Sequence, residues 1–226
     1  MMECQNGLHG SAMNDIGTES AGSELPQTVL DKIARGISVS NSEFDLLYPE
    51  QVRRLSEIHW TPVETAKRAA SFAVVKPGAR VLDVGSGAGK FCIVGALTTN
   101  GNFFGVEQRG PLVKVASKLS KKYNISRVQF FHKNALDTDW SGFDSIYLFN
   151  PFSENLDETI RIDHLCELNA ELYVKYIRYT QAKLYCMPIG TRVVVLNKFG
   201  GDLPSSYRLV HREEIGYLPL EAWEKK

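Results

Sequence analysis

Short apolar runs alternate with longer segments of helical pattern along most of this chain. Five of the runs are rich in Val, Ile, Leu and Phe and are bounded by glycine or polar turn residues, which is typical of buried β-strands. These runs are RVLDV from Arg80, NFFGVE from Asn102, RVQFF from Arg127, FDSIYLF from Phe143 and TRVVVL from Thr191. Runs that are apolar on both faces favour a parallel sheet covered by helices on both sides.

Helical patterns fill the gaps between these strands. Before the first strand, Thr61, Pro62 and Glu64 predict a helix start, with a hydroxyl N-cap, a proline at the first helical position and a glutamate at the capping-box position. The alanines that follow supply a small-residue face for packing against a sheet. The later helical patterns cover residues 91–99, 111–123 and 154–187, the last with a bend near Asn169.

The two ends of the chain differ from this alternation. Residues 1–23 are rich in Gly, Ser, Asn and acidic residues, which predicts a disordered tail. Residues 24–60 contain helical pieces that are too short to fold alone, so we expect them to form a helical cap on the core. At the other end, residues 206–225 read as two strands joined by a turn that contains glycine.

Strands that alternate with helices, followed by a terminal hairpin, predict an α/β fold. We expect a doubly wound, mostly parallel sheet of seven strands, with an N-terminal helical cap and an antiparallel hairpin at the carboxyl end. Residues 61–226 would form this domain, after the tail and the cap. Ligands of such sheets bind at the carboxyl ends of the strands.

Composition and charge limit the function classes. The chain has 226 residues, 43% of them hydrophobic, which is enough for one compact domain with additions. Lys plus Arg and Asp plus Glu each number 26, so the chain lacks the basic excess of a non-specific nucleic-acid binder. Four scattered cysteines without metal-ligand spacing indicate a reducing compartment and no metal site. With no signal-peptide pattern and no apolar run of membrane length, we expect a cytoplasmic protein.

The first strand ends in a glycine-rich loop that indicates a nucleotide-type site. Glycines at positions 85, 87 and 89 let the backbone turn sharply and leave room for a ligand, and the helix that follows offers free N–H groups. A phosphate loop of the Walker type would need glycine where Val84 stands. A dinucleotide fingerprint would need glycine where Lys90 stands. Both templates are therefore excluded.

The pattern D-x-G-x-G-x-G, from Asp83 to Gly89, resembles motif I of the class I S-adenosylmethionine (SAM) dependent methyltransferases. The resemblance covers residues 61–226 and implies SAM as the cofactor. It implies that Asp83 orients the loop or receives the ammonium group of the cofactor. The loop residues implied to contact the cofactor are Gly85, Ser86, Gly87 and Gly89.

Further cofactor contacts follow from the same resemblance. In that family the acid at the end of the second strand binds both ribose hydroxyls, which implies this role for Glu107. Asn134 occupies the place of the residue that contacts the adenine amino group, and Asp137 is close enough to compete. The Thr61-Pro62 pair is similar to an element that holds the methionine carboxylate, although an N-cap role explains Thr61 equally well. The adjacent residues Gln108 and Ala135 complete the implied cofactor contacts.

The segment Asn150-Pro151-Phe152, at the end of the fourth strand, is the most informative feature for the chemistry. It resembles the [D/N]-P-P-[Y/F] motif of N-methyltransferases, with one proline instead of two. In those enzymes the polar side chain and the proline carbonyl accept the two N–H bonds of the target, and the aromatic ring stacks on its plane. The resemblance implies these catalytic roles for Asn150, Pro151 and Phe152. The alternative is an Asn-Pro turn that only closes the strand.

The sequence therefore predicts a SAM-dependent methyltransferase that acts on a nitrogen acceptor in a small molecule, a protein or an RNA. One alternative is a small-molecule O-methyltransferase, with a catalytic base at His59, His132 or His164. Another is a SAM-binding regulatory protein without transfer activity. The sequence indicates neither the identity of the acceptor nor the oligomeric state.

Overall fold

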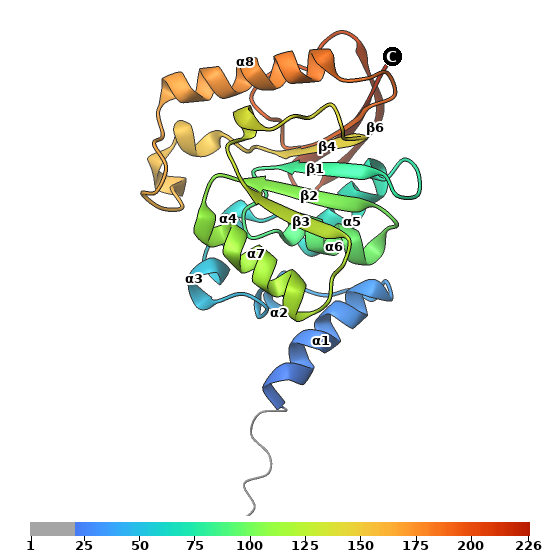
Figure 1. The fold of residues 1–226 in the computed structure, drawn as a ribbon, viewed down its shortest axis with the longest axis vertical. Coiled ribbons are helices and arrows are strands. Elements are labelled where there is room, and N and C mark those ends of the chain that lie inside the picture. Colours follow the sequence, from blue (N-terminus) through green and yellow to red (C-terminus); the bar gives the residue numbers. More distant parts are fainter. Residues whose placement is uncertain (1–20) are drawn as a thin grey trace, which may run out of the picture.

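The computed structural model of the protein describes residues 21–226, and a seven-stranded sheet forms its centre (Figure 1). The strands are β1 Arg80–Val84, β2 Asn102–Glu107, β3 Val128–His132, β4 Ser145–Phe149, β5 Arg192–Leu196, β6 Tyr207–Ile215 and β7 Leu218–Lys225. Their order across the sheet is β3-β2-β1-β4-β5-β7-β6. Strands β1 to β5 pair in parallel, whereas β7 runs antiparallel to both β5 and β6. The predicted doubly wound sheet with a terminal antiparallel hairpin is confirmed.

The position of β1 in the middle of the sheet determines where a ligand can bind. Strands β2 and β4 flank β1, and Val84 at the end of β1 is in register with Val106 of β2 and Leu148 of β4. The chain reverses its direction of winding at this point, since β2 and β3 extend to one side and β4 and β5 to the other. Crevices for ligands form at such reversals, outside the carboxyl ends of the strands.

Successive strand residues enter two separate cores, one on each face of the sheet. Val81 packs in the core under α5 and α6, whereas its neighbour Leu82 packs in the core under α8. Figure 1 shows α5, α6 and α7 on one side of the sheet and α8 on the other. These helices are α5 Val63–Ala73, α6 Lys90–Thr98, α7 Gly110–Lys122 and α8 Ala170–Cys186. The alanine face predicted for α5 is fully buried, which allows the helix to lie close to the sheet.

The N-terminal segment packs on the first of these faces. It contains α1 Ala21–Ala34, α2 Asn41–Asp45, α3 Glu50–Arg53 and α4 Ser56–His59. Val29, Leu30 and Ile33 of α1 are buried in the same core as α6. The predicted tail, residues 1–23, lies outside the described residues except for its last three, which belong to α1. The segment up to Trp60 is therefore packed on the domain.

The start of α5 differs from the prediction. The helix begins at Val63, after Pro62 at the N-cap position, and the Val63 N–H donates to Oδ1 of Asn41 at 2.8 Å. The Thr61 hydroxyl instead pairs with the Tyr147 hydroxyl at 2.9 Å. The predicted capping box is therefore wrong, because a side chain 22 positions earlier supplies the cap.

The prediction of one long helix before β5 is wrong in its first half. Helix α8 begins at Ala170, and Asn169, the expected bend, is its N-cap, accepting from the Leu172 N–H at 2.8 Å. The preceding segment contains two 3-10 turns, η2 Ser153–Asn155 and η3 Glu158–Ile160. Within it, Asp157 accepts from the Thr159 N–H at 2.9 Å. Side-chain bonds of this kind compete with helical hydrogen bonds, which explains the irregular path.

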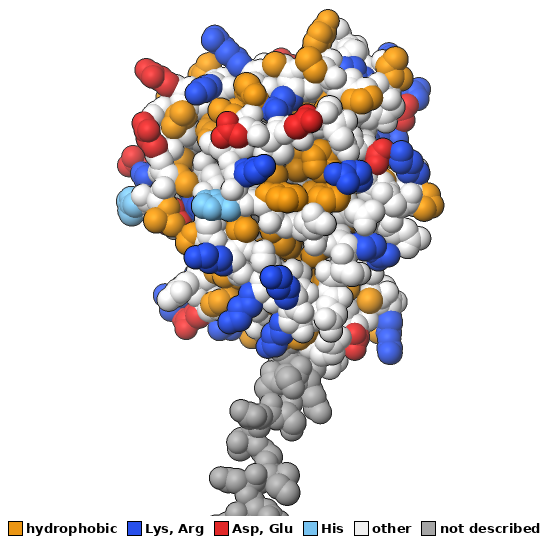
Figure 2. Space-filling model, in the orientation of Figure 1, with side chains coloured by type: hydrophobic (Ala, Val, Ile, Leu, Met, Phe, Trp, Pro, Cys, Tyr) orange, Lys and Arg blue, Asp and Glu red, His pale blue; other side chains and the backbone are white. Residues whose placement is uncertain are grey.

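The α8 face of the sheet is covered incompletely near β3. Phe131 is 36% exposed and its ring is parallel to that of Phe104, while the Arg80 guanidinium lies 4.5 Å from the Phe104 ring centre. Figure 2 shows apolar side chains open to solvent in the middle of the face it views, with Lys and Arg side chains around them.

Within residues 21–226, no helix combines the length and apolarity needed to cross a membrane.

Candidate functional site

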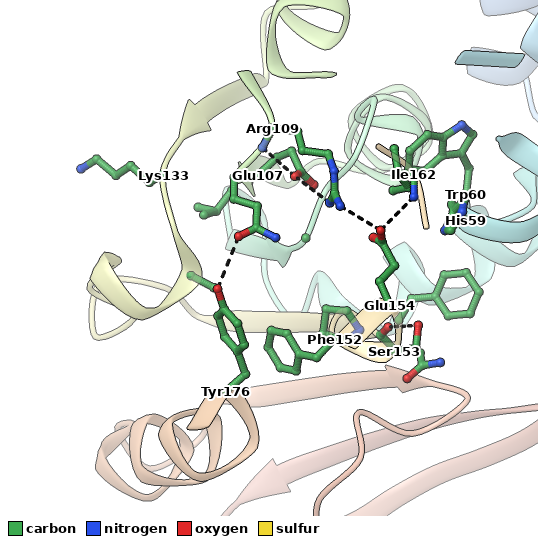
Figure 3. A pocket seen from close by; sticks show the side chains of 17 residues that line it. His59, Trp60, Glu107, Arg109, Lys133, Phe152, Ser153, Glu154, Ile162 and Tyr176 are labelled. Atoms are coloured by element: carbon green, nitrogen blue, oxygen red, sulfur yellow. Dashed lines mark hydrogen bonds and ion pairs between the residues drawn. The ribbon is translucent and has the colours of Figure 1, made fainter. Parts of the chain in front are cut away.

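The main pocket lies beyond the carboxyl ends of β1, β2 and β4 (Figure 3). Its hollow encloses about 630 Å³ when the open mouth is included. The wall combines the glycine loop after β1, the turns after β2 and β4, the end of the N-terminal cap and the segment before α8. No group of three or more His, Cys, Asp or Glu side chains between residues 21 and 226 is arranged to hold a metal ion.

The glycine loop leaves no room for side chains. Gly85, Gly87 and Gly89 have φ angles of +79°, +54° and +81°, in the region that favours glycine. A Cβ atom on Gly87 would overlap the indole ring of Trp60, and one on Gly85 would lie 3.1 Å from Cβ of Pro151. The loop therefore forms a bare backbone cradle between the N-terminal cap and the turn after β4.

Glu107 ends β2 with its carboxylate in the pocket wall. The residue is 5% exposed, its Oε2 accepts from the Gly87 N–H at 3.0 Å and its Oε1 from the Arg109 N–H at 2.8 Å. Burial raises the pKa of this carboxyl, and the two backbone donors and the Arg109 charge oppose that rise. Each oxygen keeps a second lone pair, so Glu107 can hold the loop and still accept from two ligand hydroxyls. Gln108 also lines the pocket.

A smaller hollow, about 320 Å³ when its open mouth is included, shares Trp60 with the main pocket, and Thr61, Asp83 and Ser86 line it. Asp83 is 4% exposed, and burial raises the pKa of its carboxyl to about 7 although the Cys92 thiol donates to it at 3.4 Å. The Ser86 hydroxyl is buried without a hydrogen-bond partner in the described part of the chain. Polar groups with unused hydrogen-bonding capacity thus surround the hollow beside the glycine loop.

Asn134 lies behind the pocket wall rather than in it. Its Nδ2 donates to the Tyr176 hydroxyl at 2.6 Å, and its Oδ1 accepts from the Leu136 N–H at 2.9 Å. The wall at this point is formed by Lys133 and Ala135. Asn134 is therefore engaged in capping the turn after β3 and in holding Tyr176. Asp137, the competing candidate, is also absent from the wall.

Asn150, Pro151 and Phe152 all line the pocket at the end of β4. Asn150 has φ of +40°, a conformation that Asn tolerates better than most residues. Its side-chain amide makes no hydrogen bond with another residue of the described chain, while its carbonyl accepts from the Ser153 hydroxyl at 3.2 Å. The Phe152 ring is 5% exposed and stacks on Tyr176 with 4.8 Å between centroids. An amide with free hydrogen-bonding capacity thus faces an aromatic-lined hollow.

The histidines considered as bases differ in position. His59 lines the main pocket, and burial lowers the pKa of its ring, which favours the neutral form. His132 pairs with the Gln108 carbonyl at 3.0 Å outside the wall, and His164 is exposed. Only His59 of the three is in a position to meet a ligand.

Several residues of the wall are not among those that the sequence predicts, and Arg109, Glu154 and Tyr176 are the ones that make polar contacts across it. Arg109 and Glu154 pair at 2.8 Å across the pocket, and Tyr176 extends from α8 toward Gln108 (Figure 3). The only available signal for Arg109 was its place two residues after Glu107. Nothing in the sequence indicates that this arginine is buried.

Comparisons with known proteins agree with this fold. A family model described as a methyltransferase domain matches residues 75–192. An RNA methyltransferase from Salinibacter ruber, solved with S-adenosyl-L-homocysteine (SAH), aligns over 73% of this chain and 92% of its own at 20% identity, with a TM-score of 0.55. TrmN from Thermus thermophilus aligns over 77% of this chain at 18% identity, with a TM-score of 0.57, and 52% of its length is covered. Comparison with curated proteins gave no match.

The matched family model spans more than half of the chain, from just before β1 to the start of β5. It therefore contains the glycine cradle, Glu107 and the pocket residues at the end of β4. The sheet order and the terminal antiparallel hairpin are those of the class I fold. The chain belongs to the methyltransferase domain family and is a SAM-dependent methyltransferase of class I.

Proposed function

We propose that this enzyme transfers the methyl group of SAM to a nitrogen atom held by Asn150 and by the carbonyl of Pro151. The observation that carries the proposal is the unpaired side-chain amide of Asn150 in the pocket wall. Its neighbour Pro151 approaches Gly85 of the glycine cradle closely, so the turn after β4 and the cofactor loop share one space. A nitrogen acceptor bound there would lie beside the cofactor.

The chain has groups that fit each part of SAM. Gly85 and Ser86, which line the two hollows, would support it on their backbone, and Glu107 would accept from both ribose hydroxyls. Gly87 and Gly89 line neither hollow, and they would contribute by shaping the loop, with the Gly87 N–H bonded to Glu107. Gln108 and Ala135 would flank the adenine, with Asn134 acting from behind through Tyr176. Thr61 and Asp83 would meet the amino-acid end in the smaller hollow. When bound, SAM supplies a methyl group already activated by its sulfonium charge.

Orientation is then the main task of the protein. The side-chain oxygen of Asn150 and the carbonyl of Pro151 would accept hydrogen bonds from the two N–H groups of the substrate nitrogen. These bonds would direct the lone pair of that nitrogen toward the methyl group. Phe152 would form a flat wall, since its ring is fixed by Tyr176. As the new bond forms, positive charge develops on the nitrogen, and the two oxygens stabilise it before a proton leaves to water.

The acceptor itself is proposed only by its chemistry, a planar nitrogen that carries N–H bonds. The Salinibacter ruber relative is an RNA methyltransferase, and the exocyclic amine of a nucleobase is one such group. Amides and amines of proteins or small molecules present the same donors. A chain with zero net charge gives no reason to prefer a polyanionic acceptor.

Transfer to oxygen is the second candidate, and the position of His59 favours it. Its ring lines the main pocket, and its lowered pKa keeps it neutral near pH 7, as a general base requires. An oxygen acceptor would need such a base, whereas a nitrogen acceptor would not. The atom that receives the methyl group decides between the two candidates.

Replacing Glu107 with glutamine is expected to weaken SAH binding at least about tenfold, because it removes two charge-assisted hydrogen bonds to the ribose, each worth roughly 1.5–3 kcal/mol. Calorimetry on the folded variant measures this change. Glu171→Gln, on the exposed side of α8, is the matched control and should bind SAH normally. A Glu107→Gln protein with wild-type affinity would show that the ribose is held elsewhere.

SAH affinity is expected to increase with pH up to neutrality, because the Asp83 carboxyl has a pKa of about 7 and must ionise to receive an ammonium group. The contact between the ionised carboxylate and the ammonium group is present above that pKa and is lost as pH falls below it, so the affinity for SAH rises with pH. We expect about tenfold weaker binding at about pH 6 than at about pH 8. Asp83→Asn should remove this dependence. An unchanged profile in Asp83→Asn would assign the titration to another buried acid, with Glu107 the next candidate.

A further inference from the structure

Arg109 connects the two sides of the pocket. The residue is 3% exposed, its Nη2 donates to Oε2 of Glu154 at 2.8 Å, and its Nε donates to Oδ1 of Asp163 at 3.0 Å. Its Nη1 lies 3.8 Å from Oε1 of Glu107. One guanidinium therefore faces the carboxylate that ends β2 and two carboxylates of the segment that follows β4. Figure 3 shows Arg109 between Glu107 and Glu154.

The two carboxylates beyond β4 also hold the backbone of their own segment. Oε2 of Glu154 accepts from the Ile162 N–H at 3.0 Å, and Oδ1 of Asp163 accepts from the Leu165 N–H at 3.0 Å. We call residues 150–169 the acceptor segment. This segment has no helix longer than a single 3-10 turn, so such bonds determine its path. The same oxygen atoms that bind Arg109 thus shape the acceptor segment.

Burial makes this arrangement sensitive to small displacements. Removing a guanidinium from water is unfavourable, and only well-formed pairs offset that cost. Arginine is suited to this position because its planar fork holds several N–H donors in fixed directions and its charge is more weakly hydrated than that of lysine. A shift of Glu107 on one side, or of Glu154 on the other, would therefore change the interactions of the same buried cation.

We propose that Arg109 is a positioning residue that couples cofactor binding to the order of the acceptor segment. The inference rests on the proposed function, in which Glu107 binds the ribose and Asn150 binds the acceptor. A cofactor on Glu107 fixes the carboxylate that faces Arg109, and the guanidinium in turn fixes Glu154 and Asp163. By linkage, an ordered acceptor segment strengthens cofactor binding by the same factor. The acceptor subsite is then complete only after the cofactor has bound.

Asp163→Asn tests this coupling from outside the pocket wall, which Asp163 does not line. Asparagine keeps a side-chain oxygen that can accept from the Leu165 N–H and so preserves the turn, but it removes the negative charge beside Arg109. We expect SAH binding about fivefold weaker, at the low end of typical coupling energies. Asp157→Asn is the matched control, because Asp157 makes the same kind of turn in the acceptor segment and, within the described chain, its carboxylate accepts hydrogen bonds only from Thr159.

Hydrogen exchange gives a second readout that a purely structural role would not change. In the wild-type protein SAH is expected to slow amide exchange throughout residues 150–169, and in Asp163→Asn and Arg109→Lys this protection should shrink. The proposal is overturned if SAH leaves that exchange unchanged, or if Asp163→Asn binds SAH as tightly as Asp157→Asn. Neither measurement uses an acceptor, so a wrong nitrogen assignment would not affect them. Wild-type SAH affinity in Glu107→Gln would instead contradict the cofactor assignment.

Discussion

Replacing Asn150 with glycine is expected to lower the rate of methyl transfer by about a hundredfold, the scale of losing one preorganised polar contact. The affinity for SAH should stay within a few fold, because Asn150 is assigned to the acceptor and not to the cofactor. Glycine is the informative replacement, since Asn150 has φ of +40° and glycine adopts this conformation without strain. Turnover, SAH affinity and thermal melting should be measured on the same preparation.

Two further substitutions at this position separate chemistry from backbone conformation. Asn150→Asp keeps an oxygen acceptor and should retain part of the activity. Asn150→Ala loses the amide and adds backbone strain, so it should lose activity like the glycine variant and also melt at a lower temperature. If Asn150 only closes the turn after β4, a stable Asn150→Gly protein would keep full activity, which would rule out the acceptor role.

Replacing Lys90 with methionine is expected to lower the free energy of unfolding by about 3–5 kcal/mol, as for other buried ion pairs that lose one partner. Lys90 begins α6 directly after the glycine loop and is 2% exposed. Its Nζ donates to Oδ1 of Asp45 at 2.9 Å and to the Ser56 hydroxyl at 3.2 Å. The pair attaches the N-terminal cap to the loop, so methionine would leave the Asp45 carboxylate buried without its cation.

The double variant Lys90→Met/Asp45→Asn should recover much of this loss, because it removes the unpaired charge as well. Lys118→Met, at an exposed position on α7, is the matched control and should change stability by less than about 0.5 kcal/mol. Urea unfolding measures all three proteins. A loss below about 1 kcal/mol in Lys90→Met would mean that the pair behaves like a surface ion pair and does not hold the cap in place.

The sheet could be predicted because its strands are buried on both faces and therefore carry an unbroken apolar signal. Val193, Val194, Val195 and Leu196 of β5 are all buried, and each is identifiable as apolar without knowledge of its partners. The alternation with helices then determined the parallel order. Local composition was sufficient here because burial on two faces leaves few other residue choices.

Features that depend on distant residues could not be predicted. The cap of α5 comes from Asn41 and replaces the local candidate Thr61. The acceptor segment has a composition that suits a helix, but its path is determined by pairs with Arg109, which is 45 positions before Glu154 and 54 before Asp163. Sequence spacing contains no signal for such pairs, because it does not reveal which charges become buried together.

The residues of the candidate site also include some whose place could be predicted and some whose place could not. Gly85, Glu107 and the residues from Asn150 to Phe152 lie at the ends of strands, so the fold alone brings them to one pocket. Asn134 also follows a strand, yet its side chain caps the next turn and binds Tyr176. A position after a strand thus determines the neighbourhood of a residue, while local hydrogen bonds decide which way its side chain points.

The atom that receives the methyl group tests the central claim most directly. The protein should be incubated with a cell extract and SAM labelled with ¹³C in its methyl group, and the labelled products compared with those formed by the Asn150→Gly variant. The chemical shift of each new methyl signal identifies the atom to which it is bonded. We expect a signal bonded to nitrogen that the wild-type protein forms and the variant does not. A methyl group on oxygen, or equal nitrogen signals from both proteins, would contradict the account.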